Sequence, residues 1–306
     1  MTFDAKSLLQ AASQVAAGQQ YPKSALYLVA SPIGNLADLT LRAVQVLTLA
    51  DQVACEDTRV TGRLLSMLGL DKKLVPLHQH NEVGAAAPLI EAMQAGARIA
   101  YLSDAGTPAV SDPGAHLVKA AHAAGLTVVP IPGASSVTTA VSAAGDVHAQ
   151  GFRFLGFLPA KGQARVQALV DNLSQPASLV LFEAPHRVEL LAKELADIAA
   201  DRPVTICREL TKQFEEIATL PAARLPAWLT EQPNRQRGEF VWVVHAAPNQ
   251  DDAVDLPASA LALLRELTQH LPIKQAAALV ADATGLNRKQ LYETALAWRK
   301  HDEAAE

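Results

Sequence analysis

The chain has 306 residues, of which 50% are hydrophobic and 19% are charged, a balance typical of a folded globular protein and not of a disordered one. This length predicts two compact domains with an appendage. The 26 basic and 31 acidic residues give a net charge of -5, which excludes a chain-wide basic surplus of the kind frequent in nucleic-acid-binding proteins. Only local positive charge could therefore serve RNA binding.

The chain's two cysteines, Cys55 and Cys207, are far apart and form no C-x-x-C pair. This spacing argues against a disulfide framework and against a zinc ribbon. No stretch approaches the roughly 18 to 20 uninterrupted apolar residues of a membrane span, and the N-terminus lacks the basic-then-apolar layout of a signal peptide. We therefore expect a cytoplasmic protein.

Short apolar runs alternate with helical patterns along most of the chain, which predicts an α/β fold with mostly parallel strands. Residues 1–24, rich in Ala, Gln and Ser, are expected to form a flexible N-terminal tail that is loose or weakly helical. A first α/β domain is expected over 25–133, with strands at 26–29, 98–102 and 126–131 and a helix at 112–124. A second is expected over 134–248, with helices at 134–144, 162–173 and 187–199 and strands at 152–157, 179–183, 204–208 and 239–245.

Residues 249–306 begin with a polar, proline-marked linker and continue as three amphipathic helical segments, expected at 258–270, 273–282 and 288–300. The turn between the last two is typical of a helix-turn-helix. A strip of positive charge in the last segment could bind RNA phosphates, and it consists of Arg288, Lys289, Arg299 and Lys300. A helical cap that only stabilises the protein is the alternative.

Four segments that follow predicted strands are rich in Gly, Pro and small polar residues: 31–36, 103–108, 132–136 and 183–187. In an open parallel sheet, ligands bind beyond the carboxyl ends of the strands, so these segments are the places for a binding site. Gly34, Gly106 and Gly133 permit close backbone approach, and helix N-termini offer free N–H groups. Simple turn formation is the alternative for any single segment.

Several common sequence signatures are absent. No G-x-G-x-x-G follows a strand and no G-x-x-x-x-G-K-[ST] is present, so neither a dinucleotide nor a triphosphate is indicated. There is no H-E-x-x-H, and we expect no metal site. Taken alone, the residues indicate an α/β enzyme for a small ligand, with a helical appendage.

Five phrases nevertheless occur in a recognisable order: SPIGNL at 31–36, EDTR at 56–59, HNE at 80–82, SDAGTP at 103–108 and RELTK at 208–212. With GFLPAK at 156–161 and RGEF at 237–240, they make the chain similar to the bacterial 16S rRNA (cytidine-2'-O)-methyltransferases of the tetrapyrrole methylase superfamily. The resemblance covers about residues 25–300. It implies a two-domain tetrapyrrole-methylase-like fold with a C-terminal helix-turn-helix-like module that binds RNA.

The resemblance further implies S-adenosylmethionine (SAM) bound in a cleft between the two domains of a homodimer. The implied substrate is a cytidine, number 1402 in the family, of 16S rRNA in the decoding region of the small ribosomal subunit. Asp104 and Thr107 are expected at the amino-acid end of SAM, and Val110 and Phe182 beside its adenine. The full set of expected cofactor-binding residues is Pro32, Gly34, Asp104, Gly106, Thr107, Val110, Ser135, Ser136 and Phe182.

Methylation of a ribose hydroxyl requires in-line positioning and a group that accepts the proton. Expected acceptors are Glu183 and His186 first, and then Asp57 and Glu209. Each has a structural alternative: Asp57 could cap a helix beside a charge pair, Glu209 could form a surface pair, and His186 could cap a helix. Cations expected at RNA phosphates, besides those of the last helix, are Arg59, Arg187 and Lys212.

Two other functions stay open at this point. One is methylation of a small tetrapyrrole of the precorrin type, since a fold does not fix its substrate. The other is a non-enzymatic, ligand-sensing regulator that uses the C-terminal helices on DNA. The helical appendage and the RELTK run argue against the tetrapyrrole substrate.

Overall fold

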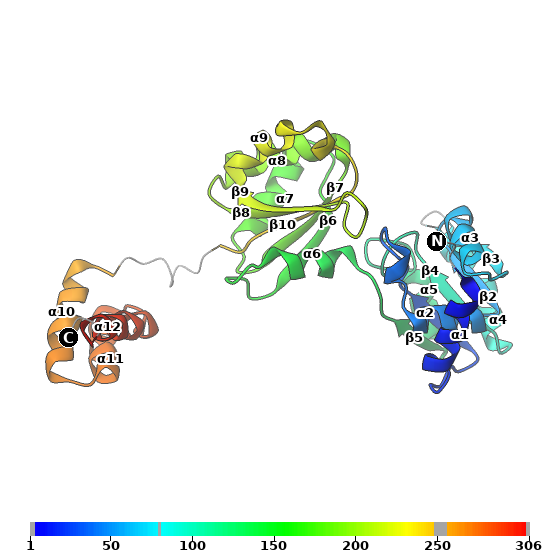
Figure 1. Cartoon of the computed structure of the whole chain (residues 1–306), viewed down its shortest axis with the longest axis horizontal. Coiled ribbons are helices and arrows are strands. Elements are labelled where there is room, and N and C mark those ends of the chain that lie inside the picture. Colours follow the sequence, from blue (N-terminus) through cyan, green and yellow to red (C-terminus); the bar gives the residue numbers. More distant parts are fainter. Residues whose placement is uncertain (1–3, 79–80, 248–255, 304–306) are drawn as a thin grey trace.

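The computed structural model describes residues 4–78, 81–247 and 256–303. Figure 1 shows three groups of elements along the chain: a first α/β domain, a second α/β domain and a bundle of helices. None of the helices in the described part of the chain is long and apolar enough to cross a membrane.

The first domain contains a parallel sheet of five strands in the order β3-β2-β4-β1-β5. The central strand register pairs Leu26 of β1 with Ile99 of β4 and Val128 of β5. The strands are β1 (Ala25–Val29), β2 (Gln52–Cys55), β3 (Lys73–Pro76), β4 (Arg98–Leu102) and β5 (Thr127–Ile131). β1 and β4 are apolar and almost fully buried, as expected for strands covered on both faces.

Helices cover both faces of this sheet. On one face, residues of α2 (Leu41–Leu49) and α3 (Thr58–Met67) share a core with Tyr27 and Val53. On the other face, residues of α4 (Glu82–Gln94) and α5 (Ala115–Ala123) share a core with Leu26 and Tyr101. Because all five strands are parallel, the loops that follow them gather at one edge of the sheet.

The N-terminal segment differs from the expected flexible tail. Residues Ala5–Ala16 form α1, which packs on α2 and buries Ala12 and Ala16. Asp4 caps this helix by accepting a hydrogen bond from the backbone N–H of Lys6 at 3.1 Å. Composition suggested a loose segment because the apolar residues are small, but an i, i+4 spacing of alanines is sufficient for close packing against a second helix.

The second domain contains a mixed sheet of five strands in the order β6-β7-β10-β8-β9. Only β6 and β7 pair in parallel, whereas β10 is antiparallel to both β7 and β8. The strands are β6 (Phe152–Phe157), β7 (Ser178–Glu183), β8 (Pro203–Arg208), β9 (Glu216–Pro221) and β10 (Phe240–Val244). The edge strand β9 was not expected, because its half-exposed residues give only a weak apolar alternation.

Two cores also flank this second sheet. The larger contains Trp242 and residues of α7 (Gln163–Leu173), α8 (Val188–Ile198) and α9 (Leu225–Glu231). The smaller lies on the opposite face, where α6 (Ser136–Ala144) packs against β10. This second face is turned toward the first domain, because the same core includes Ile33 from the loop after β1.

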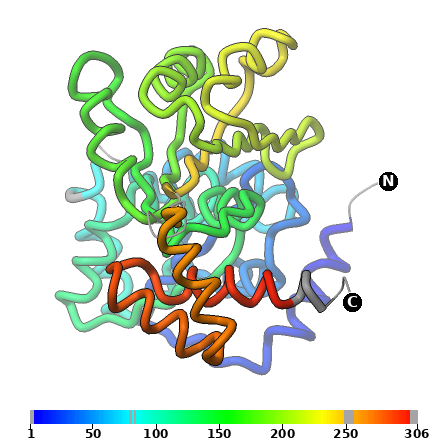
Figure 2. The backbone as a smooth tube through the Cα atoms, turned by 90° about the vertical axis from the view of Figure 1, so that its left-hand side faces the viewer, coloured from blue at the N-terminus to red at the C-terminus, as the bar shows by residue number. Residues whose placement is uncertain are grey.

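The C-terminal bundle consists of α10 (Ala258–His270), α11 (Ile273–Thr284) and α12 (Arg288–Glu303), which Figures 1 and 2 show side by side. Its own core includes Leu264, Val280 and Leu291. Gly285 ends α11 in the left-handed conformation, with φ of 71°, which allows the sharp turn into α12. The module therefore has an independent core, as a small folded unit requires.

Candidate active site

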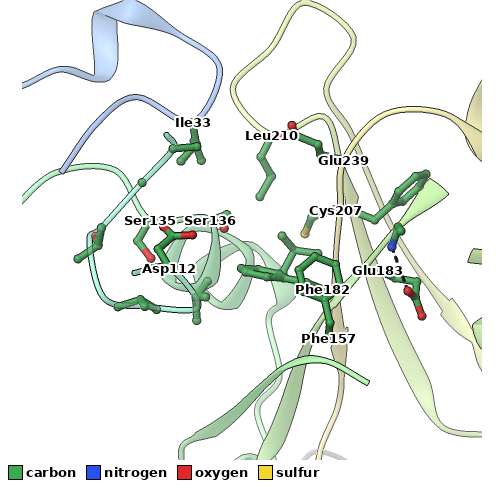
Figure 3. A pocket seen from close by; sticks show the side chains of 18 of the residues that line it. Ile33, Asp112, Ser135, Ser136, Phe157, Phe182, Glu183, Cys207, Leu210 and Glu239 are labelled. Carbon is green, nitrogen blue, oxygen red and sulfur yellow. Dashed lines mark hydrogen bonds between the residues drawn. The ribbon is translucent and has the colours of Figure 1, made fainter. Parts of the chain in front are cut away.

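A cavity of about 430 Å³ lies between the two sheets and is lined by residues of both domains. The first domain contributes Ile33 and the loop after β4, and the second contributes the start of α6 and residues at the ends of β6, β7, β8 and β10. In Figure 3, Asp112, Ser135 and Ser136 lie on one side of this space, with Phe157 and Phe182 on the other. The cavity thus combines a polar wall with an aromatic one, which suits a ligand with both kinds of group.

The loop after β4, residues 103–114, is held by buried hydrogen bonds. Ser31 and Gly106 exchange two backbone hydrogen bonds of 2.9 and 3.1 Å, which tie this loop to the one after β1. The Tyr101 hydroxyl donates to the Pro113 carbonyl at 2.8 Å. Ala109 and Ser111 have positive φ angles of 64° and 63°, an uncommon conformation for residues with a side chain. Strain of this kind persists where surrounding contacts fix the backbone.

Glu82 fixes the far end of the same loop. Its buried Oε1 accepts hydrogen bonds from the backbone N–H groups of Gly114 at 2.9 Å and His116 at 2.7 Å, at the start of α5. A carboxylate is favourable there because the first N–H groups of a helix have no intrahelical partners. Glu82 of the HNE phrase therefore has a structural role that reaches the cavity through the loop, whereas His80 lies outside the described residues.

The N-terminus of α6 opens onto the cavity. Ser135 precedes the helix without capping it through its side chain, and Ser135, Ser136 and Val137 all line the space. The Thr107 hydroxyl donates to the Ala134 carbonyl at 3.2 Å and so ties this turn to the loop after β4. The first-turn N–H groups of α6 suit an anionic oxygen of a ligand.

Glu183 is one of the residues that line the cavity, but its carboxylate points away from the cavity, as Figure 3 shows. Its Oε2 lies 2.6 Å from Nη2 of Arg165, and its Oε1 lies 2.9 Å from Nε of Arg187. The Ala184 N–H also donates to Oε1 at 2.9 Å. The side chains of Arg165 and Glu183 are both 0% exposed. Both carboxylate oxygens are thus committed to protein partners.

The other expected proton acceptors lie outside the residues that line the cavity. Asp57 caps α3 and pairs with Arg59, whose hydrogen bond lowers the pKa of Asp57 to about 2. His186 is exposed in the short turn Pro185–Arg187. Burial raises the pKa of Glu209, but hydrogen bonds from Lys212 and from the Glu239 N–H outweigh it and leave the pKa below its ordinary value. Asp57 is thus a helix cap beside a charge pair, and Glu209 is the partner of a lysine, as their structural alternatives described.

Three ionisable groups that the sequence did not single out as site residues line the cavity, namely Asp112, Cys207 and Glu239. Burial raises the pKa of Asp112 to about 6; a hydrogen bond with Ser103 opposes this shift, and the nearby Glu56 and Asp104 carboxylates add to it. Burial also raises the pKa of the Cys207 thiol to about 12, so the sulfur stays protonated at neutral pH. A protonated thiol is a poor nucleophile.

Close contacts between the domains depend on glycine at two places beside the cavity. A Cβ atom on Gly34 would lie 2.4 Å from Cγ of Lys212 and 3.2 Å from the Leu210 carbonyl oxygen. A Cβ atom on Gly156 would lie 3.0 Å from Oγ of Ser111. Only glycine lets the two domains approach this closely without rearrangement.

Two family models match the chain, one described as Tetrapyrrole (Corrin/Porphyrin) Methylases over residues 25–226 and one as RsmI C-terminal HTH domain over residues 254–299. Similar curated proteins carry the name Ribosomal RNA small subunit methyltransferase I. That of Vibrio cholerae is 44% identical over 89% of this chain and 94% of its own length. That of Pseudomonas aeruginosa is 42% identical over 89% and 96%.

The chain belongs to the ribosomal RNA small subunit methyltransferase I family. Solved structures support the fold of its two α/β domains. Diphthine synthase aligns with a TM-score of 0.57 at 19% identity and covers 72% of this chain and 90% of its own. Uroporphyrin-III C-methyltransferase from Thermus thermophilus, crystallised with S-adenosylhomocysteine (SAH), aligns with a TM-score of 0.52 at 20% identity, covering 72% and 96%.

In this methyltransferase the expected cofactor-binding residues fall into two groups. Those that line the cavity are Gly106, Thr107, Val110, Ser135, Ser136 and Phe182. Pro32, Gly34 and Asp104 are not among the residues that line it. Asp104 instead accepts a hydrogen bond from the Asp57 N–H at 3.0 Å and so joins the loops after β2 and β4. Apolar lining residues that the sequence did not single out include Ile33, Phe157, Leu210 and Val241.

The expected RNA-binding cations of the α/β domains also differ in their surroundings. Arg187 pairs with Glu183 and donates to the Leu158 carbonyl at 2.8 Å. Lys212 pairs with Glu209 and Glu239, each at 2.9 Å. The Arg59 side chain, although paired with Asp57, is 84% exposed. In the RsmI C-terminal domain, Arg288, Lys289 and Arg299 are exposed on α12, whereas the side chain of Lys300 lies outside the described residues.

Proposed function

We propose that this protein transfers the methyl group of SAM to the ribose 2'-oxygen of cytidine 1402 in 16S rRNA, within the small ribosomal subunit. The observation that carries the proposal is the match to Ribosomal RNA small subunit methyltransferase I over 89% of the chain, C-terminal module included. The solved tetrapyrrole methylases cover only 72% of this chain although nearly all of their own length is aligned. The helical module is therefore an addition to the small-molecule methylase fold.

The residues around the cavity fit SAM. Its adenine and ribose need apolar and aromatic walls, which Val110 and Phe182 provide in the described cavity. Its carboxylate suits the N–H groups at the start of α6, beside Ser135 and Ser136. A volume of about 430 Å³ lies within the range of cavities for ligands of this size.

SAM, when bound, supplies a methyl group made electrophilic by the sulfonium. The protein's own contribution is then mainly positioning, because in-line alignment of a hydroxyl with the methyl carbon can account for many orders of magnitude in rate. The loop after β4 is suited to this task, since Glu82, Tyr101 and Ser31 hold its backbone from three sides. Ile33 and Leu210 line the cavity on the side above Ser135 and Ser136 in Figure 3.

The outer face of α12 supports RNA binding. Arg288, Tyr292 and Arg299 are exposed at helical spacings of four and seven residues, so one face presents two guanidinium groups around a tyrosine. Guanidinium groups bind phosphates and aromatic rings stack on unpaired bases. Arg59 in the first domain is a further exposed cation for a phosphate.

We propose in addition that the enzyme acts in the cytoplasm as a homodimer.

The test is methyl transfer from labelled SAM to 30S subunits, to naked 16S rRNA and to a uroporphyrinogen. Digestion of the RNA to nucleosides followed by mass spectrometry should yield 2'-O-methylcytidine from the 30S subunits, and fragment mapping should place it at one position. A base-methylated nucleoside would refute the ribose assignment, and label in the tetrapyrrole alone would refute the RNA substrate. Light scattering of the purified chain reports on the homodimer.

A further inference from the structure

We infer that the carboxylate of Asp112 accepts the proton of the substrate hydroxyl when the methyl group is transferred. This inference rests on the proposed function, because it assumes a hydroxyl nucleophile. It replaces Glu183 and His186, the acceptors that the sequence favoured, with a residue on the opposite wall of the cavity. Figure 3 shows the Asp112 side chain directed into the space beside Ser135 and Ser136.

Three carboxylates line the cavity, those of Asp112, Glu183 and Glu239. Glu183 is fully buried and paired with two arginines, so its charge is neutralised and its oxygens are occupied. Glu239 is paired with Lys212 at 2.9 Å and its side chain is 76% exposed, so water solvates it. Among the ion pairs of the described residues, none involves Asp112.

Several groups act on the Asp112 carboxylate. Ser103, directly after β4, lowers its pKa. Two other carboxylates, those of Glu56 after β2 and Asp104 on the same loop, raise it. Tyr101 of β4 also faces this cluster, together with Glu82 of α4. Like charges and partial burial both favour the protonated form, so this carboxylate has a higher proton affinity than an ordinary aspartate.

A proton acceptor must also be held in place. Asp112 lies between Ser111, which has a positive φ, and Pro113, whose carbonyl accepts from Tyr101 and from the Ala109 N–H. Glu82 fixes the next turn through Gly114. The aspartate backbone is therefore anchored on both sides, which is the arrangement expected of a preorganised catalytic group.

The reaction balances with this assignment. The oxygen of the substrate hydroxyl forms a bond to the methyl carbon while the carbon–sulfur bond breaks, and the electron pair of that bond returns to sulfur and neutralises the sulfonium. The O–H proton passes to the Asp112 carboxylate. A positive charge in the cavity favours the ionised carboxylate before transfer, and its loss on transfer favours the protonated form afterwards.

The experiment compares Asp112→Asn with Asp197→Asn, a matched change at an exposed position on α8. Single-turnover transfer from labelled SAM to 30S subunits is measured against pH, and SAH affinity is measured by calorimetry. We expect the Asp112 variant to be at least about 100-fold slower, the usual range for loss of a general base. Its SAH affinity should change less than about threefold. The wild-type rate should fall as the pH is lowered through the pKa of this carboxylate, which the positive charge of bound SAM brings below about 6, and the variant should lack this dependence.

Three outcomes would overturn the inference. The variant could keep more than a third of the wild-type rate, it could lose SAH affinity in proportion to rate, or it could keep the acid limb of the pH profile. Thermal melting of both variants establishes that each is folded. The nucleoside formed by the wild type tests the proposed function separately, because it does not depend on any variant.

Discussion

Replacing Arg165 with methionine should destabilise the second domain by about 3 to 5 kcal/mol, because it removes a shared partner of two carboxylates and leaves that of Glu194 without an ion pair. The Arg165 side chain is 0% exposed and binds Glu183 and Glu194, each at 2.6 Å. After the change, Glu183 keeps Arg187, whereas Glu194 loses its ion-pair partner. Methionine fills much of the same volume, so the loss reports on charge and not on a cavity.

Urea unfolding followed by tryptophan fluorescence measures this loss. The chain has three tryptophans, and a Trp298→Phe background leaves Trp228 and Trp242, which both belong to the core of the second domain. Adding Glu194→Gln to Arg165→Met should cost less than the sum of the single changes by about 2 kcal/mol, since the stranded charge is removed.

The matched control is Arg153→Met, at an exposed position on β6, which should change the free energy of unfolding by less than about 0.5 kcal/mol. A loss below about 1 kcal/mol for Arg165→Met, or strictly additive losses in the pair, would refute the account of the buried network.

Three further predictions concern the cavity and the module. Gly34→Ala should weaken SAH binding about tenfold by calorimetry, because the new Cβ atom meets Lys212 and Leu210. Gly84→Ala is the control and should leave the affinity unchanged, since no atom lies within 4 Å of its new Cβ atom. Equal SAH affinities of the two variants would show that the Gly34 contact does not shape the cavity. Folding raises the pKa of Asp112 from 3.8 to about 6. The contribution of Asp112 to the free energy of unfolding is therefore fully present below pH 3.8 and is lost as the pH rises through about 6. Relative to wild type, the free energy of unfolding of Asp112→Asn in urea titrations should therefore rise by about 1 kcal/mol from pH 4 to pH 7, after allowance for solvent screening of a partly buried group. A difference between the two proteins that does not change with pH would contradict this. The cations of α12 should be replaced jointly by alanine: Arg288, Lys289, Arg299 and Lys300. RNA affinity should fall, and the slope of log affinity against log salt concentration should become shallower by about 0.7 to 0.9 per lost phosphate contact. An unchanged slope in filter binding would indicate that the module is only a structural cap.

The strands and loops were predictable where apolar runs end in glycine or proline. The expected strands at 98–102 and 152–157 coincide with β4 and β6, and the helix at 258–270 coincides with α10. Helix starts were less accurate, since the helix expected at 112–124 begins at Ala115. Glu82 provides the reason, because its carboxylate reaches from α4 to satisfy the N–H groups of that helix.

The candidate site was predictable in its backbone and less so in its charges. Loops that follow parallel strands must gather at one edge of a sheet, and Thr107 and Ser136, which the resemblance named, do line the cavity there. The partners of Glu183 could not be foreseen, because Arg165 belongs to a helix 18 residues away and no local pattern marks it as buried. Asp112 was overlooked for a similar reason, since in sequence it resembles an ordinary residue before a helix.

The position of β10 between β7 and β8 has a consequence for the order in which the protein can fold during synthesis. All strands of the first sheet are complete by residue 131, so that sheet can form while the remainder is still being translated. The second sheet cannot, because without residues 240–244 its strands remain two separate pairs, β6 with β7 and β8 with β9. Trp242, at the centre of the larger core, also arrives only with this strand. The wall of the cavity that carries Phe182 and Cys207 is therefore assembled late, after nearly the whole catalytic region has been translated and shortly before the helical module follows.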